Sequence, residues 1–216
     1  MGEFELGVPA LVCRWRLAGR TLPLENRHLR ALSQRRVNDA PVTTGLVAWA
    51  KQHIEWTLAD GAALNPDGVL MVVVDEAGRA AMTVGPYEPL AAAEPSVLAA
   101  RALASAREAL TTGVAPESLW AVRDGALTWG AAEDGLPSGA ATLVLDLART
   151  LGIAVTRDLR LADAVAAGED PDAPVLLVSD EHGVVPASGC DDELAHRLAQ
   201  GYATLLEKAS RRPFGA

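Results

Sequence analysis

Lysine is the scarcest basic residue in this 216-residue chain, which contains only Lys51 and Lys208. Aromatic residues make up 4% of the sequence although half of it is hydrophobic, so the core must be built mainly from Ala, Leu and Val. Because no secretory signal is recognisable, the two cysteines, Cys13 and Cys190, are expected to be free thiols in a reducing compartment.

Long hydrophobic runs and an excess of positive charge are also missing. No apolar run approaches the ~20 residues that span a bilayer, and the N-terminal MGEFELGVPA lacks the basic and apolar parts of a signal peptide. The formal net charge of −9 argues against nucleic acid or an anionic membrane as the main partner. We therefore expect a cytoplasmic protein that binds neither nucleic acid nor a membrane.

The pattern of apolar residues predicts an α+β protein made of two halves. In the first half, two short strands are predicted within 6–24, helices over 25–36 and 45–58, and two strands within 68–90. The run Leu70–Val74 is continuously apolar, which predicts a strand buried on both faces.

The segment after Pro89 breaks this pattern and is the predicted linker. We therefore assign residues 1–90 to a small N-terminal domain, 91–95 to a linker and 96–216 to a larger C-terminal domain. The second half begins with a helix over 96–110 and ends with an amphipathic helix whose N-cap is Asp191 or Asp192.

The most informative stretch is Ala121–Val155, which predicts a hairpin, a Gly/Pro loop, a helix and a strand. Asp124-Gly125 separates two apolar runs and supplies the positive φ angles of a tight turn. Gly152 stands where a helix C-cap is expected. The loop before the helix, together with the helix N-terminus, is a natural site for an anion, although it lacks a Walker or dinucleotide-binding motif.

Four passages in order carry a resemblance to a known family: LPLENRHLRAL, SLWAVRDGALTW, GLPSGAATLVLDLARTLGIAV and LLVSDEHGVVPASG. Together they resemble the fold-type IV pyridoxal-phosphate proteins, which include branched-chain and D-amino-acid aminotransferases and aminodeoxychorismate lyases. The resemblance implies a two-domain class IV aminotransferase fold, a cleft between the domains and a homodimer. It also implies that this chain is shortened at its N-terminus.

The resemblance implies a cofactor that the sequence does not equip the chain to use. Pyridoxal phosphate needs a lysine amine for its Schiff base, and in the family that lysine would lie near Ala92–Ser96, where no lysine occurs. Lys51 and Lys208 match no family motif. We therefore expect no cofactor.

The residues that anchor the cofactor phosphate in the family are replaced as well. Its helix arginine corresponds to Ala31, and its loop contacts correspond to Gly139 and Ala140. Ser138, Gly139 and the helix N-terminus remain as groups that could donate hydrogen bonds to an anion. We therefore place Ser138 and Gly139 in the substrate-binding set. A phosphate-binding threonine of the family falls near Asp180, whose charge would repel a phosphate.

Asp180, Glu181 and His182 are the candidate catalytic residues, because they would form an acid–base cluster at the cleft. The same residues also make an ordinary solvated hairpin turn. Glu117 lies near the family's acidic partner of the pyridine nitrogen, and Arg14 alternates with apolar neighbours on a strand; both are predicted to bind substrate. The four histidines and two cysteines show no spacing typical of a metal site.

Three functions stay open at this level. The first is a degenerate relative that binds or transforms a small amino- or carboxylate-bearing metabolite without pyridoxal phosphate. The second is a genuine aminotransferase or aminodeoxychorismate lyase of amino-acid metabolism with a displaced lysine. The third is a non-catalytic interaction or regulatory subunit.

Overall fold

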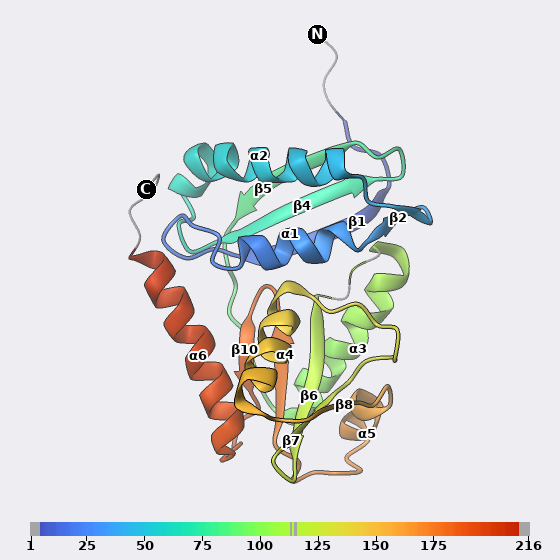
Figure 1. Ribbon diagram of the computed structural model, residues 1–216, viewed down its shortest axis with the longest axis vertical. Helices are drawn as coiled ribbons and strands as arrows, with labels where there is room; N and C mark the ends of the chain where they lie inside the picture. Colours follow the sequence, from blue (N-terminus) through green and yellow to red (C-terminus); the bar gives the residue numbers. More distant parts are fainter. Residues whose placement is uncertain (1–4, 113, 115, 212–216) are drawn as a thin grey trace.

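The computed structural model describes residues 5–112, 114 and 116–211. Two β-sheets, of three and five strands, lie one above the other along the long axis of the molecule, each with its own helices (Figure 1), and a further pair of short strands forms a two-stranded ribbon. The smaller sheet is formed by the N-terminal part of the chain and the larger sheet by the C-terminal part. Residues 86–94, which include most of the predicted linker, form no helix or strand. The boundaries at residues 90 and 96 remain predictions from the sequence.

The smaller sheet has the antiparallel order β1-β4-β5 and packs against two helices. Its elements are β1 (Pro9–Arg16), α1 (Glu25–Ser33), β2 (Arg36–Val37), β3 (Ala40–Pro41), α2 (Thr44–Asp60), the 3-10 turn η1 (Gly61–Ala63), β4 (Val69–Asp75) and β5 (Ala80–Gly85). In β1, Leu11, Cys13 and Trp15 are buried in the core shared with α1 and α2. Because side chains alternate along a strand, Arg14 and Arg16 point to the opposite face, toward the C-terminal half.

The larger sheet has the order β10-β9-β6-β7-β8 and carries helices on both faces. Its elements are α3 (Pro95–Thr112), β6 (Glu117–Arg123), β7 (Ala126–Trp129), α4 (Gly139–Leu151), β8 (Val155–Arg157), α5 (Leu161–Ala166), β9 (Val175–Ser179), β10 (Gly183–Pro186) and α6 (Glu193–Ser210). All neighbouring strands are antiparallel except β7 and β8.

Alternation along the central strands explains the two helical layers. In β6, Leu119 and Ala121 pack with α3 and α5, whereas Trp120 and Val122 pack with α4 and α6. Strand β9 divides in the same way, and all five of its residues are buried. A continuously apolar strand of this kind is typical of a sheet covered on both sides.

Local signals in the sequence account for several element ends. Asp124 and Gly125 have φ angles of 50° and 74° in the β6–β7 turn, as the Asp-Gly pair predicts. Gly152 ends α4 in the left-handed region with φ of 70°. Asp192 caps α6 by accepting a hydrogen bond from the Ala195 backbone. These predictions are confirmed.

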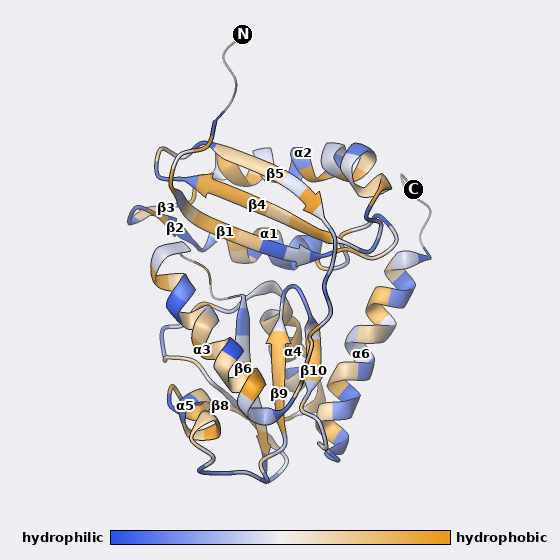
Figure 2. Cartoon of the chain, turned by 180° about the vertical axis from the view of Figure 1, so that it is seen from behind, coloured by the Kyte–Doolittle hydropathy of each residue, from blue (hydrophilic) through white to orange (hydrophobic). Residues whose placement is uncertain are grey.

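Two predictions about strands are wrong. Residues 17–24 form no second strand, because Gly19 and Arg20 both have positive φ and reverse the chain into a short Ala18–Thr21 bridge. Strand β4 is not buried on both faces, since Met71 and Val73 are only half-buried. Helices α1 and α2 both lie behind the β1-β4-β5 sheet in Figure 2. The front face of this sheet is therefore not covered by helices of the N-terminal half.

Among the described residues, no helix is both long and apolar enough to cross a membrane.

Gly183→Ala is expected to destabilise the protein far more than Gly152→Ala. Both glycines have positive φ, which costs an alanine about 1 kcal/mol. A Cβ at Gly152 meets open space, whereas at Gly183 it would lie 2.1 Å from the Tyr202 ring behind β10. Urea denaturation should therefore show a loss for Gly183→Ala of about 3 kcal/mol or more. Equal losses in the two variants would contradict this packing.

Candidate functional site

The two halves meet where the polar face of β1 contacts α3 and the β9–β10 turn. The Arg14 guanidinium donates to both carboxylate oxygens of Glu108 on α3, at 3.1 and 3.5 Å. The Arg16 backbone N–H donates to the Asp180 carbonyl at 3.0 Å, and its guanidinium carbon lies 3.2 Å from the centre of the Tyr87 ring. This junction encloses the candidate site.

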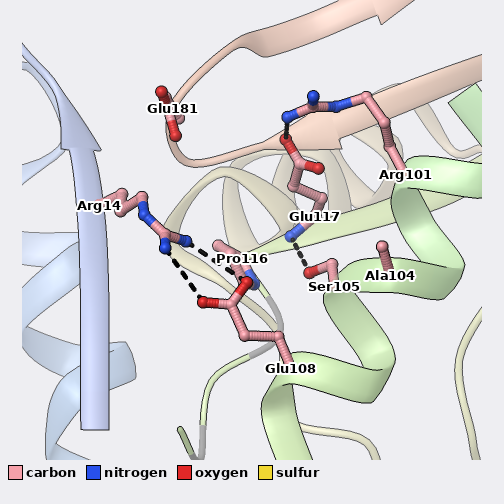
Figure 3. Close-up of a pocket in the computed structure, with 8 residues that line it drawn as sticks. All are labelled: Arg14, Arg101, Ala104, Ser105, Glu108, Pro116, Glu117 and Glu181. Carbon is pink, nitrogen blue, oxygen red and sulfur yellow. Dashed lines mark hydrogen bonds and ion pairs between the residues drawn. The ribbon is translucent and has the colours of Figure 1, made fainter. Parts of the chain in front are cut away.

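A pocket of about 170 Å³ opens between β1, α3 and the turn that follows β9 (Figure 3). It is lined by Arg14, Arg101, Ala104, Ser105, Glu108, Pro116, Glu117 and Glu181. Helix α3 supplies four of these residues from one face, because positions three or four apart lie side by side on a helix. The lining carries two guanidinium groups and three carboxylates.

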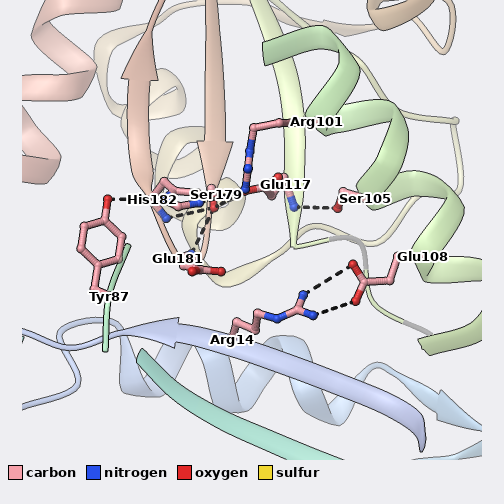
Figure 4. Close-up of polar contacts among 9 residues, drawn as sticks. All are labelled: Arg14, Tyr87, Arg101, Ser105, Glu108, Glu117, Ser179, Glu181 and His182. Carbon is pink, nitrogen blue, oxygen red and sulfur yellow. Dashed lines mark hydrogen bonds and ion pairs between the residues drawn. The ribbon is translucent and has the colours of Figure 1, made fainter. Parts of the chain in front are cut away.

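Glu117 is the centre of a hydrogen-bonded cluster beside this pocket (Figure 4). Its carboxylate accepts from Arg101 at 2.8 Å and from the Ser179 hydroxyl at 3.2 Å. Its backbone N–H donates to the Ser105 hydroxyl at 3.1 Å. The first residue of β6 is therefore fixed by α3 on one side and by β9 on the other.

His182 completes the cluster as a neutral imidazole. Its Nε2 lies 2.9 Å from Arg101 Nη2, and an arginine can only donate, so Nε2 accepts. Its Nδ1 then carries the proton and donates to the Tyr87 hydroxyl at 3.3 Å. Burial lowers the pKa of His182 to about 4, against the opposing effect of Glu117 and with smaller contributions from Arg101 and Arg16.

Glu181 points into the pocket near Arg14 (Figure 3). Burial raises the pKa of Glu181, with Arg14 as the main opposing charge. No hydrogen bond or ion pair joins its carboxylate to another residue in the part of the chain that the structure describes; only its backbone N–H is bonded, to the Ser179 hydroxyl at 3.1 Å. A carboxylate that is partly buried without a partner favours the approach of a cationic or donor group.

Asp180 turns away from the pocket, toward the N-terminus of α4. Its carboxylate accepts from the Ala140 N–H at 2.7 Å and from the Gly139 N–H at 3.4 Å. The N-cap Ser138 accepts from Ala141 at 3.2 Å. Asp180 and Ser138 are both buried, so this end of α4 is covered by the protein itself.

The structure brings some of the predicted site residues together and separates others. Arg14, Glu117 and Glu181 line one pocket. Ser138 and Gly139, predicted to bind substrate, lie instead beside Asp180 at the buried helix end. The predicted acid–base cluster of Asp180, Glu181 and His182 does not form, because the three side chains meet different partners.

Ser105, Glu108 and Tyr87 belong to the site but were not predicted from the sequence. A signal was present for the first two, because Arg101, Ser105 and Glu108 follow one another at helical spacing on α3. Tyr87 lies on a segment without regular structure, and only the packing of the two halves brings it to His182.

No protein-family model matches this sequence, and no curated protein matches it either. Solved structures do match. The 4-amino-4-deoxychorismate lyase from Pseudomonas aeruginosa has a TM-score of 0.59 and 18% identity, with 93% of this chain and 95% of that chain covered. A hypothetical aminotransferase from Mycobacterium tuberculosis, in its PLP-bound form, has a TM-score of 0.60 and 16% identity, with 97% and 94% covered. A fold IV-transaminase from Curtobacterium pusillum has a TM-score of 0.57 and 16% identity, with 96% and 89% covered.

This chain has the class IV aminotransferase fold. The α+β class predicted from the apolar pattern and the class IV aminotransferase fold implied by the four sequence passages are thereby confirmed. At 16–18% identity the likeness concerns the fold, and the chemistry must be judged from the residues of this chain.

The pocket offers pyridoxal phosphate (PLP) no lysine, and the groups that would meet its phosphate and its pyridine nitrogen are already paired. A Schiff base needs a lysine at the site, but Lys51 on α2 and Lys208 on α6 are both exposed and neither lines the pocket. The α4 N-terminus, which would receive a phosphate, already holds the Asp180 carboxylate. Glu117 is engaged by Arg101 and Ser179 rather than free for a pyridine nitrogen.

Within the described residues, no group of three or more His, Cys, Asp and Glu side chains is arranged to hold a metal ion.

His182→Gln is expected to flatten the acid side of the stability profile. The pKa of His182 falls from its usual 6.5 to about 4 on folding, so between these values the unfolded chain binds a proton that the folded protein does not. The free energy of unfolding of the wild type therefore falls as the pH drops through this window, by about 1–3 kcal/mol. Urea denaturation of both proteins across the window measures the difference.

The raised pKa of Glu181 makes the free energy of unfolding rise as the pH drops, opposite to the effect of His182. Glu181 is present in both proteins, so its contribution cancels when their profiles are compared. Parallel stability profiles for the wild type and His182→Gln would contradict a buried neutral imidazole.

Proposed function

We propose that this protein binds a small amino-acid-like metabolite in the pocket between β1 and α3, and that it does so without PLP. The observation that carries the proposal is Glu181, a partly buried carboxylate that faces the pocket without a partner among the described residues. It lies close to the arginine that the sequence suggested as a carboxylate-binding residue, Arg14.

The charges around the pocket support a ligand with an ammonium group. Arg101 pairs with Glu117 at 2.8 Å, and Arg14 pairs with Glu108 at 3.1 Å. Glu181 is then the one lining carboxylate that neither pair neutralises. An ammonium group beside it would compensate its charge and donate hydrogen bonds to its oxygens.

Arg14 supports a carboxylate on the same ligand. Its side chain and that of Glu108 are 35% and 36% exposed, so their ion pair is wet and contributes little to stability. A ligand carboxylate can therefore replace Glu108 on the Arg14 guanidinium at small cost, in the bidentate geometry that arginine favours.

Binding is better supported than catalysis. Both ring nitrogens of His182 are already engaged, and its side chain is only 5% exposed. Asp180 is held by α4. General acid–base chemistry requires a group within hydrogen-bonding reach of the substrate, and of the three predicted catalytic residues only Glu181 has a free carboxylate at the pocket.

A PLP-dependent aminotransferase or lyase is the alternative that the fold suggests, and a non-catalytic subunit is another. The homodimer and the cytoplasmic location expected from the sequence remain predictions.

Glu181→Gln is expected to abolish the response to the ligand. The probes are common amino acids, each compared with its deaminated carboxylate, such as alanine with propionate and glutamate with glutarate. At least one amino acid should raise the wild-type midpoint of thermal unfolding by several degrees, while its deaminated partner does not. Glu133→Gln, at an exposed position outside the pocket, is the matched control and should respond like the wild type.

The binding proposal fails if no amino acid shifts the midpoint, or if deaminated partners act as strongly. Retention of the full response in Glu181→Gln would also refute the role of its carboxylate.

Wild-type protein treated with stoichiometric PLP and then borohydride is expected to gain no pyridoxyl adduct in intact-mass spectra, because neither lysine lies at the pocket. The control is the double variant Lys51→Ala, Lys208→Ala, which should likewise show no adduct on its own mass. A stoichiometric adduct in the wild type that one lysine substitution removes would favour the PLP-dependent alternative.

A further inference from the structure

Two N–H groups at the N-terminus of α4 donate to a side chain from a distant part of the chain. The first N–H groups of a helix have no partner within the helix and together form a site for an anion. Here Ser138 satisfies the Ala141 N–H in the usual way for an N-cap. The Gly139 and Ala140 N–H groups instead donate to the carboxylate of Asp180. Asp180 lies 40 positions after Ala140 in the chain.

Asp180 is fixed by its own backbone as well as by its side chain. Its N–H donates to the Pro116 carbonyl at 3.1 Å, and its carbonyl accepts from Arg16 of β1 at 3.0 Å. Only 5% of the side chain is exposed. One residue thus joins the end of β9, the start of β6, strand β1 and helix α4.

Buried side chains pack closely around the Asp180 carboxylate. The His28 Nδ1 atom lies 3.6 Å from Asp180 Oδ2, in a side chain that is 2% exposed, and it has no hydrogen-bond partner in the described part of the chain. Trp15 stacks on His28 at 5.0 Å. A Cβ on Gly139 would lie 2.3 Å from His28 Nδ1, so only glycine fits between them.

A buried cation stands close by. Arg35, 6% exposed, donates to the Leu136 and Pro137 carbonyls in the loop that leads into α4. Burial lowers the pKa of Arg35, and Asp180 is among the charges that oppose this shift. The helix N–H groups and Arg35 therefore offset the cost of burying the Asp180 charge.

We infer that Asp180 is a built-in anion that occupies the α4 N-terminal site in place of the acidic group of a ligand. The site is complete without phosphate, and the carboxylate also connects the two halves. Removal of the carboxylate converts the space into a site for a free small carboxylate ion. This inference concerns a place outside the proposed metabolite pocket, so it can fail or hold independently of that proposal.

Chemical rescue tests the inference directly. Asp180→Gly removes a side chain equivalent to acetate and leaves two buried N–H groups without a partner. We expect its thermal midpoint to fall by about 5–10 °C, and sodium acetate or formate to recover part of this loss relative to sodium chloride at equal ionic strength. The wild type should not distinguish these salts.

Asp192→Gly is the matched control, because Asp192 also caps a helix, α6, but at a more exposed position where water can replace it. Its midpoint should show no preference for acetate. If Asp180→Gly responds to acetate no more than Asp192→Gly or the wild type, the inference is wrong.

Asp180→Asn keeps the test decisive if the glycine variant does not fold. The amide has the same shape but no charge and places a donor group near the helix N–H groups, so we expect a midpoint several degrees below that of the wild type. A buried carboxylate without this function would instead be replaced by a neutral group at no loss. An asparagine variant as stable as the wild type would therefore overturn the inference.

Discussion

The contact between the Asp180 carboxylate and the N-terminus of α4 is the interaction on which the rest of the site depends. The 2.7 Å hydrogen bond from Ala140 is buried, and buried polar groups of this kind are costly to leave unpaired. The same residue accepts the Arg16 N–H, so the position of β1 relative to the larger sheet is set at this point. The closed end of α4 follows from where this one side chain lies.

The pocket exists because consecutive residues of the β9–β10 turn meet different surroundings. After Asp180 turns toward α4, Glu181 faces the pocket and His182 contacts Arg101 and Tyr87. The result is a class IV aminotransferase fold in which the groups that would serve a phosphate-bearing cofactor are engaged with one another. A carboxylate beside an arginine is left available, and on this pair rests our proposal of an amino-acid-like ligand.

Much of the fold could be predicted because its signals are local. The Asp124-Gly125 turn, the Gly152 cap and the helical spacing in α3 and α4 each depend on neighbouring residues. The contact between Asp180 and Ala140 could not be found in this way, since it depends on how two distant segments pack. The family resemblance placed both residues near one cofactor group and suggested that Asp180 would repel a phosphate; the structure places its carboxylate on the helix end itself.

Whether Asp180 closes the α4 N-terminus to other anions is tested most directly by NMR. Labelled wild-type protein is titrated with inorganic phosphate and with PLP. The backbone amide resonances of Gly139 and Ala140 report on any anion that reaches the α4 N-terminus. Because Asp180 already accepts from both N–H groups, these resonances should not move with either compound. Saturable shifts at Gly139 and Ala140 on addition of PLP would contradict the account.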